Sequence, residues 1–171
     1  MRSFVAALAL IAMSVLPQSV FAVSWDRINH LFYVERSKNK NVVQYDVRLT
    51  EENELPDSSP VTVYWVLENG RHQQLNSIEK RFAYGIGPQE KIGTNRFRVF
   101  PVALKDREVV IEKINGSFKA SVPINGKLSI LEKIYIESKE KLGGLPKVLY
   151  VALFGRTRQG GLRVEERIAP K

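Results

Sequence analysis

The sequence of 171 residues contains no cysteine and only two histidines. Without cysteine the chain can form neither disulfide bonds nor a cysteine-linked lipid anchor, so its fold depends on packing alone. His30 and His72 lie in separate segments and form no His-x-His or His-x-x-x-His spacing. An isolated pair of this kind lacks the ligand pattern of a zinc site, and we expect no bound metal.

Familiar catalytic motifs are missing as well. Ser37, Ser117 and Ser129 stand outside any Gly-x-Ser-x-Gly turn, which serine hydrolases use to expose the nucleophile. Gly85-Ile86-Gly87 neither follows a predicted strand nor opens a helix in a βαβ unit, as a phosphate-binding glycine loop does. No pair of acids is placed for glycoside hydrolysis. The sequence therefore predicts no catalytic residue and no cofactor, although a missing motif is weak evidence against unknown chemistry.

The one long hydrophobic run lies at the N-terminus, where Arg2 precedes an uninterrupted apolar stretch from Phe4 to Ala12. It is shorter than the roughly 20 residues that span a bilayer, and the small Ala22 suits cleavage by signal peptidase. We expect residues 1–22 to be a signal peptide and residues 23–171 to be a single β-rich domain without a transmembrane segment. The protein is then periplasmic or secreted.

The chain carries a formal charge of +8, which falls by one if Arg2 is removed with the signal peptide. A basic surface attracts polyanions. For an exported protein these are not nucleic acids but lipopolysaccharide phosphates and anionic phospholipids. Basic and acidic residues also alternate, as in 139–141 and 165–167. This mixing favours a solvated surface over a dedicated polyanion site.

Strict alternation of apolar and polar residues dominates after residue 30. Val43, Tyr45 and Val47 share one face of a predicted strand, while Gln44 and Asp46 share the other. The pattern predicts about nine strands, at residues 31–35, 43–49, 61–67, 96–99, 108–114, 118–122, 128–137, 148–155 and 162–168. We expect an all-β fold, mainly an antiparallel sandwich or barrel, and the pattern leaves those two architectures open.

Turn residues separate the predicted strands. Asn115-Gly116 and Asn125-Gly126 are dipeptides that favour tight hairpins, so residues 108–137 are expected to form an antiparallel meander. Gly143-Gly144 and Gly160-Gly161 mark two further connections. The polar stretch 50–60, with two prolines, indicates a surface loop.

One short helix interrupts the β pattern between Asn76 and Tyr84. Asn76 and Glu79 have the spacing of a capping box, and Gly85 follows as a stop signal. Ile78, Phe82 and Ala83 fall on one side of such a helix.

The segment LFYVERSKNKNVVQYDVRL at residues 31–49 resembles the opening of an uncharacterised bacterial family, domain of unknown function 4833. Blocks expected from that family also recur further along the chain, at residues 61–65, 83–85, 153–155 and 164–167. The resemblance implies an exported, β-rich protein of this size. It implies no activity and no catalytic residue.

The densest polar cluster in the chain is Asn39-Lys40-Asn41, preceded by Arg36-Ser37. It is consistent with a loop that grips a ligand, because an arginine fork binds phosphate or carboxylate and Ser and Asn add neutral hydrogen bonds. The alternative is a plain hairpin, since asparagine tolerates left-handed backbone angles and the charges can face water.

Two acids fall on apolar faces of predicted strands. Glu132 alternates with Ile130 and Ile134, and Glu166 alternates with Val164. A buried carboxylate needs a partner, and Arg36 is a candidate for that role. The alternative is a bulge or a strand end that returns each acid to solvent.

Aromatic residues gather in three neighbouring segments and indicate either core packing or an apolar pocket covered by the helix: Tyr33, Tyr64, Trp65, Phe82 and Tyr84. Together with location and fold class, these observations favour a module that binds a small amphiphilic or anionic envelope ligand, a lipid among them. The candidate contacts are Arg36, Ser37, Asn39, Asn41, Tyr84, Glu132 and Glu166. The alternative is a structural protein that docks on an envelope complex through a strand edge or its basic face.

Overall fold

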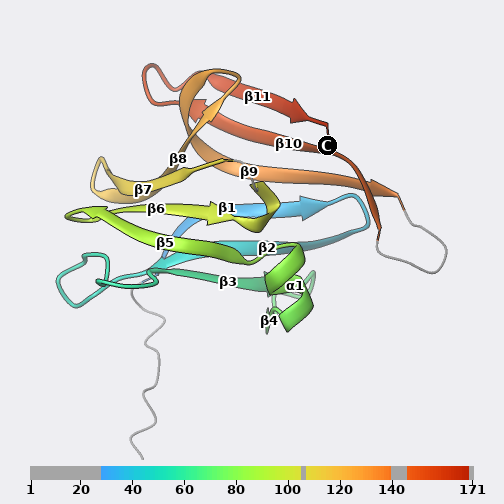
Figure 1. Cartoon of the computed structure of the whole chain (residues 1–171), viewed down its shortest axis with the longest axis horizontal. Coiled ribbons are helices and arrows are strands. Elements are labelled where there is room, and N and C mark those ends of the chain that lie inside the picture. Colours follow the sequence, from blue (N-terminus) through green and yellow to red (C-terminus); the bar gives the residue numbers. More distant parts are fainter. Residues whose placement is uncertain (1–27, 105–106, 140–145, 170–171) are drawn as a thin grey trace, which may run out of the picture.

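The computed structural model describes residues 28–104, 107–139 and 146–169. Its strands are β1 (Ile28–Arg36), β2 (Asn39–Arg48), β3 (Val61–Val66), β4 (His72–Gln74), β5 (Ile86–Gly93), β6 (Arg96–Pro101), β7 (Val109–Ile114), β8 (Ser117–Ile124), β9 (Lys127–Lys139), β10 (Lys147–Thr157) and β11 (Arg163–Ile168). One α-helix, α1 (Ser77–Phe82), and a 3₁₀ turn, η2 (Val102–Leu104), complete the described structure (Figure 1). The all-β class with one short helix is confirmed.

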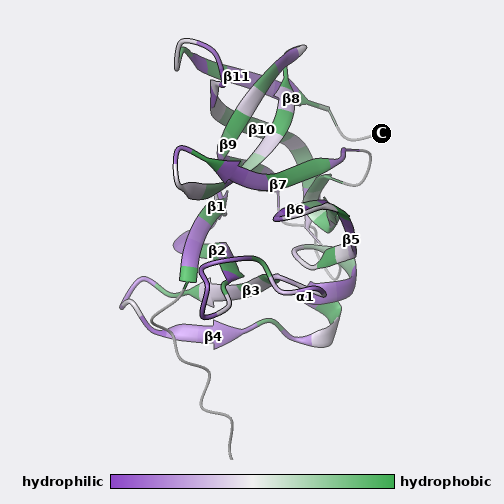
Figure 2. Cartoon of the chain, turned by 90° about the vertical axis from the view of Figure 1, so that its left-hand side faces the viewer, coloured by the Kyte–Doolittle hydropathy of each residue, from purple (hydrophilic) through white to green (hydrophobic). Residues whose placement is uncertain are grey.

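The long strand β9 joins two wings of one sheet, β1 to β4 on one side and β5 to β8 on the other. Its first residues, 127–130, pair with β8 in antiparallel fashion, and residues 133–136 pair with β1 in parallel on the same edge. The opposite edge of β9 pairs with β10, which in turn pairs with β11. The sheet therefore runs β4-β3-β2-β1-β9-β8-β7-β6-β5 and curls into a half-barrel (Figures 1 and 2).

The hydrophobic core lies between the two wings. Alternation works as the sequence predicts, since Val43, Tyr45 and Val47 of β2 are fully buried on one face. The rings of Phe32 and Tyr45 stack with centroids 4.4 Å apart. Other large buried side chains come from the opposite wing and from the joining strands: Phe97, Ile111, Phe118, Ile124, Leu131 and Leu153. The interior of the half-barrel is thus filled by side chains.

All nine predicted strands are present, and two further strands are not anticipated by the pattern. β4 is a three-residue polar segment, and every residue in it is exposed. Figure 2 shows it in the colour of hydrophilic residues. β5 contains two glycines and a proline and sits at the end of the sheet. Both are edge strands, where the apolar alternation that reveals a strand is not required.

The predicted turns are confirmed where the structure describes them. Asn115 and Gly116 have φ of 50° and 81°, and Asn125 and Gly126 have φ of 49° and 74°. These left-handed angles connect β7, β8 and β9 into the expected antiparallel meander. Residues 1–22 and Gly143-Gly144 lie outside the described residues, so the signal peptide and that connection stay predictions.

Helix α1 begins with the predicted capping box. The Asn76 side chain accepts a hydrogen bond from the Glu79 N–H, and the Glu79 carboxylate accepts one from the Asn76 N–H. A Cβ atom at Gly85 would lie 1.8 Å from the Lys80 carbonyl oxygen, so glycine is required where the chain leaves the helix. No residue of α1 is buried, and Ile78 and Phe82 are 64% and 60% exposed. The helix therefore does not turn an apolar face to the core.

No helix in the described ranges is long and apolar enough to cross a membrane.

Candidate functional site

The Arg36 side chain ends against two aromatic rings. Arg36 is the last residue of β1, and its guanidinium carbon lies 4.6 Å from the centre of the Trp65 ring and 5.9 Å from that of Tyr84. Alternation explains the first contact, because Trp65 shares the inward face of β3 with Val61 and Val63. Tyr84 reaches the same place from the segment that follows α1. We call these three residues the Arg36 cluster.

Arg36 has no carboxylate partner among the described residues. Its Nε is buried and has no hydrogen-bond acceptor within the described chain. Removing a cation from water is costly unless an opposite charge or a polarised group compensates. The faces of the two rings supply part of that compensation, since cation–π contacts stabilise a guanidinium by about 0.5–2 kcal/mol. Within the described chain, the Arg36 guanidinium is therefore stabilised by aromatic rings and not by an anion.

Tyr84 is held firmly in this cluster. It is 8% exposed, and its ring meets Trp65 edge-on at 5.2 Å. The Tyr45 hydroxyl donates a hydrogen bond of 2.5 Å to the Tyr84 carbonyl oxygen. Burial raises the pKa of the Tyr84 hydroxyl, against the opposing charge and hydrogen bond of Arg36 and the charge of Lys38. The hydroxyl therefore stays protonated at neutral pH and can donate to a ligand.

The polar residues beside Arg36 build the hairpin between β1 and β2. The Ser37 hydroxyl donates to the Ser138 carbonyl at 3.3 Å and accepts from the Ser138 N–H at 3.2 Å. Asn39 accepts a hydrogen bond from the Asn41 N–H, and Asn41 accepts one from the Glu68 N–H at 2.9 Å. The first pair of bonds ties the hairpin to β9, and the bond from Glu68 ties it to the turn after β3, so these contacts are structural. The structure thus brings together Arg36 and Tyr84, whereas a ligand contact at Ser37, Asn39 or Asn41 stays a prediction.

Glu132 lies on a β-bulge. Lys133 pairs with Phe154 and Leu131 pairs with Gly155, so Glu132 is an extra residue in β9. The bulge turns its side chain to the exposed outer surface, where it accepts a hydrogen bond of 2.8 Å from the Arg156 Nε. Of the two placements that the sequence leaves open for this acid, the structure has the bulge. Glu132 lies apart from the Arg36 cluster, and its ligand role is untested.

Glu166 is half-buried, but its partner is Arg107 rather than Arg36. The carboxylate accepts two hydrogen bonds from the Arg107 guanidinium and a third, of 2.6 Å, from the Asn125 N–H. The hydrogen bond from Arg107 holds the pKa of Glu166 below its ordinary value, and the Asn125 N–H adds to this effect. The sequence does not reveal Arg107 as this partner, because the loop before β7 has no residue pattern that predicts where its side chains point.

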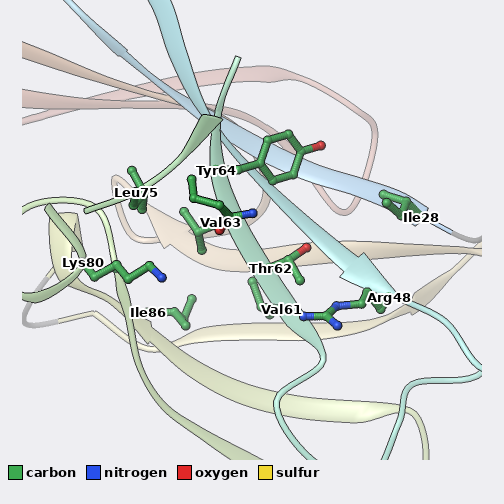
Figure 3. Close-up of a pocket in the computed structure, with 11 residues that line it drawn as sticks. Ile28, Arg48, Val61, Thr62, Val63, Tyr64, Leu75, Lys80 and Ile86 are labelled. Carbon is green, nitrogen blue, oxygen red and sulfur yellow. The ribbon is translucent and has the colours of Figure 1, made fainter. Parts of the chain in front are cut away.

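A second feature that the sequence did not reveal is a cavity of about 350 Å³ at the seam between β3 and β5. We call it the seam cavity. Its walls are partly apolar, with Ile28, Leu75 and Ile86, and two cations, Arg48 and Lys80, point into it from opposite sides (Figure 3). No sequence signal places these residues together, because they come from the start of β1, the end of β2 and the stretch 75–86.

The outer face of the sheet carries a buried carboxylate. Asp46, on the polar side of β2, is fully buried although alternation predicts exposure. It bonds His30 Nδ1 at 2.8 Å and accepts hydrogen bonds from Gln44 and from the Tyr64 hydroxyl. Burial, and then the hydrogen bond to Asp46, raises the pKa of Tyr64. The neighbouring strands thus satisfy the Asp46 carboxylate from three sides.

The described residues contain no group of three or more histidine, cysteine, aspartate or glutamate side chains that could hold a metal ion.

In comparisons with known proteins, the chain matches one protein family. Residues 32–167 match the family described as Domain of unknown function (DUF4833). No curated protein and no solved structure matches the chain.

Proposed function

The chain belongs to the DUF4833 family, and we propose that it is a binding domain for a small anionic or amphiphilic ligand whose acid group docks on Arg36. The observation that carries this proposal is a partly buried guanidinium that has two aromatic walls and no carboxylate partner in the described chain. A carboxylate or phosphate would complete the charge pairing through the arginine fork.

The neighbours of Arg36 support the same ligand class. The charges of Arg36 and Lys38 and the opposite charge of Glu79 all act on Tyr84, and Arg36 is the cation in direct contact with its ring. The rings of Trp65 and Tyr84 offer apolar contact to whatever carries the acid group. Because side chains fill the interior of the half-barrel, the ligand would lie at the rim beside Arg36 rather than deep in the core. Export of the mature chain would place that ligand in the cell envelope.

Trp65 gives a direct optical test. Exchange of the other tryptophan, Trp25→Phe, leaves Trp65 as the one tryptophan in the protein. Titration with sodium phosphate and with decanoate should change its fluorescence saturably for at least one of the two, because the ring lies against the guanidinium. The change should vanish in Arg36→Met and persist in Lys40→Met, which removes a neighbouring exposed cation. Absence of saturation with both probes, or equal responses in the two variants, contradicts the proposal.

A second candidate function is docking on a partner protein, which one observation favours. Ile78 and Phe82 expose large apolar side chains on a helix that buries nothing. Crosslinking in intact cells should then capture a reproducible partner, and Phe82→Ser should abolish the capture. Leu149→Ser, which changes another exposed apolar residue, should leave it intact. Equal capture by both variants counts against docking through α1.

A further inference from the structure

The edge of β3 is only partly covered. β4 pairs with residues 64–66 of β3, and β5, on the other side of the seam, does not pair with β3. At the start of the strand, the Gln89 side chain accepts a hydrogen bond of 3.0 Å from the Val61 N–H. A stretch of edge backbone between these two contacts faces the seam cavity, which Val61, Thr62 and Val63 line.

Hydrogen-bond alternation shows which groups face the cavity. The Arg48 N–H donates to the Pro60 carbonyl, so residues 60, 62 and 64 direct their backbone groups toward β2. Val61 and Val63 therefore direct theirs away from β2. The last pair of the β3–β4 ladder, Tyr64 with Gln74, uses the Val63 carbonyl. Within the described chain, the Val61 carbonyl and the Val63 N–H are left without a partner.

An acceptor at one residue and a donor two residues later match the N–H and the carbonyl of one ligand residue, because the C=O and N–H of a single trans amide point in opposite directions. In a parallel ladder, one residue donates its N–H to the carbonyl of residue i−1 on the neighbouring strand and accepts from the N–H of residue i+1. A ligand residue lying opposite Thr62 would satisfy both groups. Backbone groups that stay unpaired in a partly buried place cost free energy, so the edge is suited to such a ligand.

The rest of the cavity specifies what else that ligand carries. The apolar side chains of Ile28, Leu75 and Ile86 offer contact to an aliphatic group (Figure 3). Arg48 and Lys80 have no carboxylate partner among the described residues, whereas most other arginines of the sheet do. Their charges favour a ligand that carries an acid group. The volume of about 350 Å³ admits a ligand of one or two residues.

We propose that the seam cavity is a second binding site, which takes an N-acylated amino acid with a free carboxylate and an aliphatic side chain. The same chemical unit occurs at the C-terminus of a peptide. Its amide N–H donates to the Val61 carbonyl, and its carboxylate accepts from the Val63 N–H and meets the two cations. Its side chain contacts the apolar wall. This site is separate from the Arg36 cluster and does not depend on the function proposed there.

Four matched probes test the inference by isothermal titration calorimetry with the full-length mature chain. N-acetyl-leucine carries every required group. N-acetyl-N-methyl-leucine lacks the amide donor, 4-methylpentanoate lacks the amide, and N-acetyl-leucine amide lacks the carboxylate. We expect N-acetyl-leucine to bind about 2- to 10-fold more tightly than each of the other three, the range for loss of one hydrogen bond. Equal affinities for the four probes, or no saturable binding, overturn the inference.

Variants locate the binding. Arg48→Ala and Lys80→Ala should each weaken N-acetyl-leucine by about threefold or more, while Lys127→Ala, in a distant hairpin, should not. Arg36→Met should also leave this binding intact, which separates the two proposed sites. Unchanged affinity in both Arg48→Ala and Lys80→Ala contradicts the assignment.

A longer probe, acetyl-Ala-Ala-Leu, shows whether the natural ligand is the C-terminus of a peptide or a free N-acyl amino acid. Tighter binding than N-acetyl-leucine indicates the end of a peptide, and weaker binding indicates a free N-acyl amino acid. Both results support the site. A concentration-dependent dimer that N-acetyl-leucine does not dissociate would instead show that a second copy covers the β3 edge, and would overturn the inference.

Discussion

Three arginines of this protein show how the surroundings of a side chain decide its role. Arg107 is paired with Glu166 and is structural. Arg36 lies on two aromatic rings without a carboxylate, and Arg48 lines an open cavity. A guanidinium that already has its anion gains little from a ligand, whereas one without it gains a full charge pair. Arg36 and Arg48 are therefore the arginines for which we propose a binding role, whereas Arg107 stabilises the fold.

Asp46 is the residue at which we expect the largest loss of stability. Asp46→Ala removes the shared acceptor of His30, Gln44 and Tyr64 and leaves donors unpaired on the sheet. Urea unfolding should show a loss of about 2–4 kcal/mol in the free energy of unfolding. The control is Asp57→Ala, which removes an exposed carboxylate paired with Lys91 and should change stability little. Similar midpoints for the two variants would contradict the structural role of Asp46.

The Glu166–Arg107 pair gives stability that depends on pH. In the native protein the pKa of Glu166 lies below its ordinary value of 4.5, chiefly because of the hydrogen bond from Arg107. Its contribution is therefore complete above that value and is lost as the pH falls through the lowered native pKa.

Thermal unfolding midpoints measured from about pH 7 down to about pH 3 test this linkage. The difference between wild type and Glu166→Gln should shrink as the pH falls. Glu165→Gln, which changes the exposed neighbour, should show no such trend. A constant difference across the range for Glu166→Gln would contradict the pair's assigned role.

The bulge in β9 and the glycine opposite it in β10 together allow these two strands to approach closely. Glu132 is the extra residue, and Gly155 of β10 pairs with Leu131 beside it. A Cβ atom at Gly155 would lie 2.2 Å from the Ile130 carbonyl oxygen and 2.9 Å from the Ile124 side chain. The Ile130 carbonyl is a backbone group and cannot move aside as a flexible side chain can. Position 155 therefore requires glycine.

Gly155→Ala should therefore destabilise the protein by about 1–3 kcal/mol, the usual range for overpacking. Gly93→Ala is the matched control, because a Cβ there would meet its nearest neighbour at an ordinary 3.7 Å. Chemical denaturation of the two purified variants provides the comparison. If Gly155→Ala is as stable as Gly93→Ala, the close approach of β9 and β10 is wrong.

Elements with a strong local pattern could be predicted from the sequence, and edge elements could not. The nine alternating strands, the Asn-Gly turns and the capping box at Asn76 each depend on neighbouring residues. β4 and β5 lack apolar alternation, and the bulge at Glu132 arises only when β9 pairs with β10. The same limit applies to side-chain direction, because one extra residue reverses the faces of Glu132 and Leu128.

The arrangement of the whole molecule follows from one long-range contact. Parallel pairing of β1 with β9 brings together residues about 100 positions apart and closes the two wings around the core. Sequence alternation gives no register for such a pair, so the sequence alone does not distinguish a sandwich from a barrel, and the structure shows a half-barrel. The candidate site divides in the same way. The sequence singles out Arg36 and Tyr84 because of their residue types. The contact of Trp65 with both of them, and the seam cavity, form only when the strands are paired in the sheet.

An anion site at Arg36 can be detected through the NMR signal of the Arg36 side chain in solution. A ¹H–¹⁵N spectrum of the guanidinium Nε–H groups identifies Arg36 as the signal that disappears in Arg36→Lys. We expect this signal to shift saturably during titration with phosphate or decanoate, while the Arg107 signal does not shift. An Arg36 signal that does not move with either anion, or moves only as much as that of Arg107, would contradict the proposed anion site.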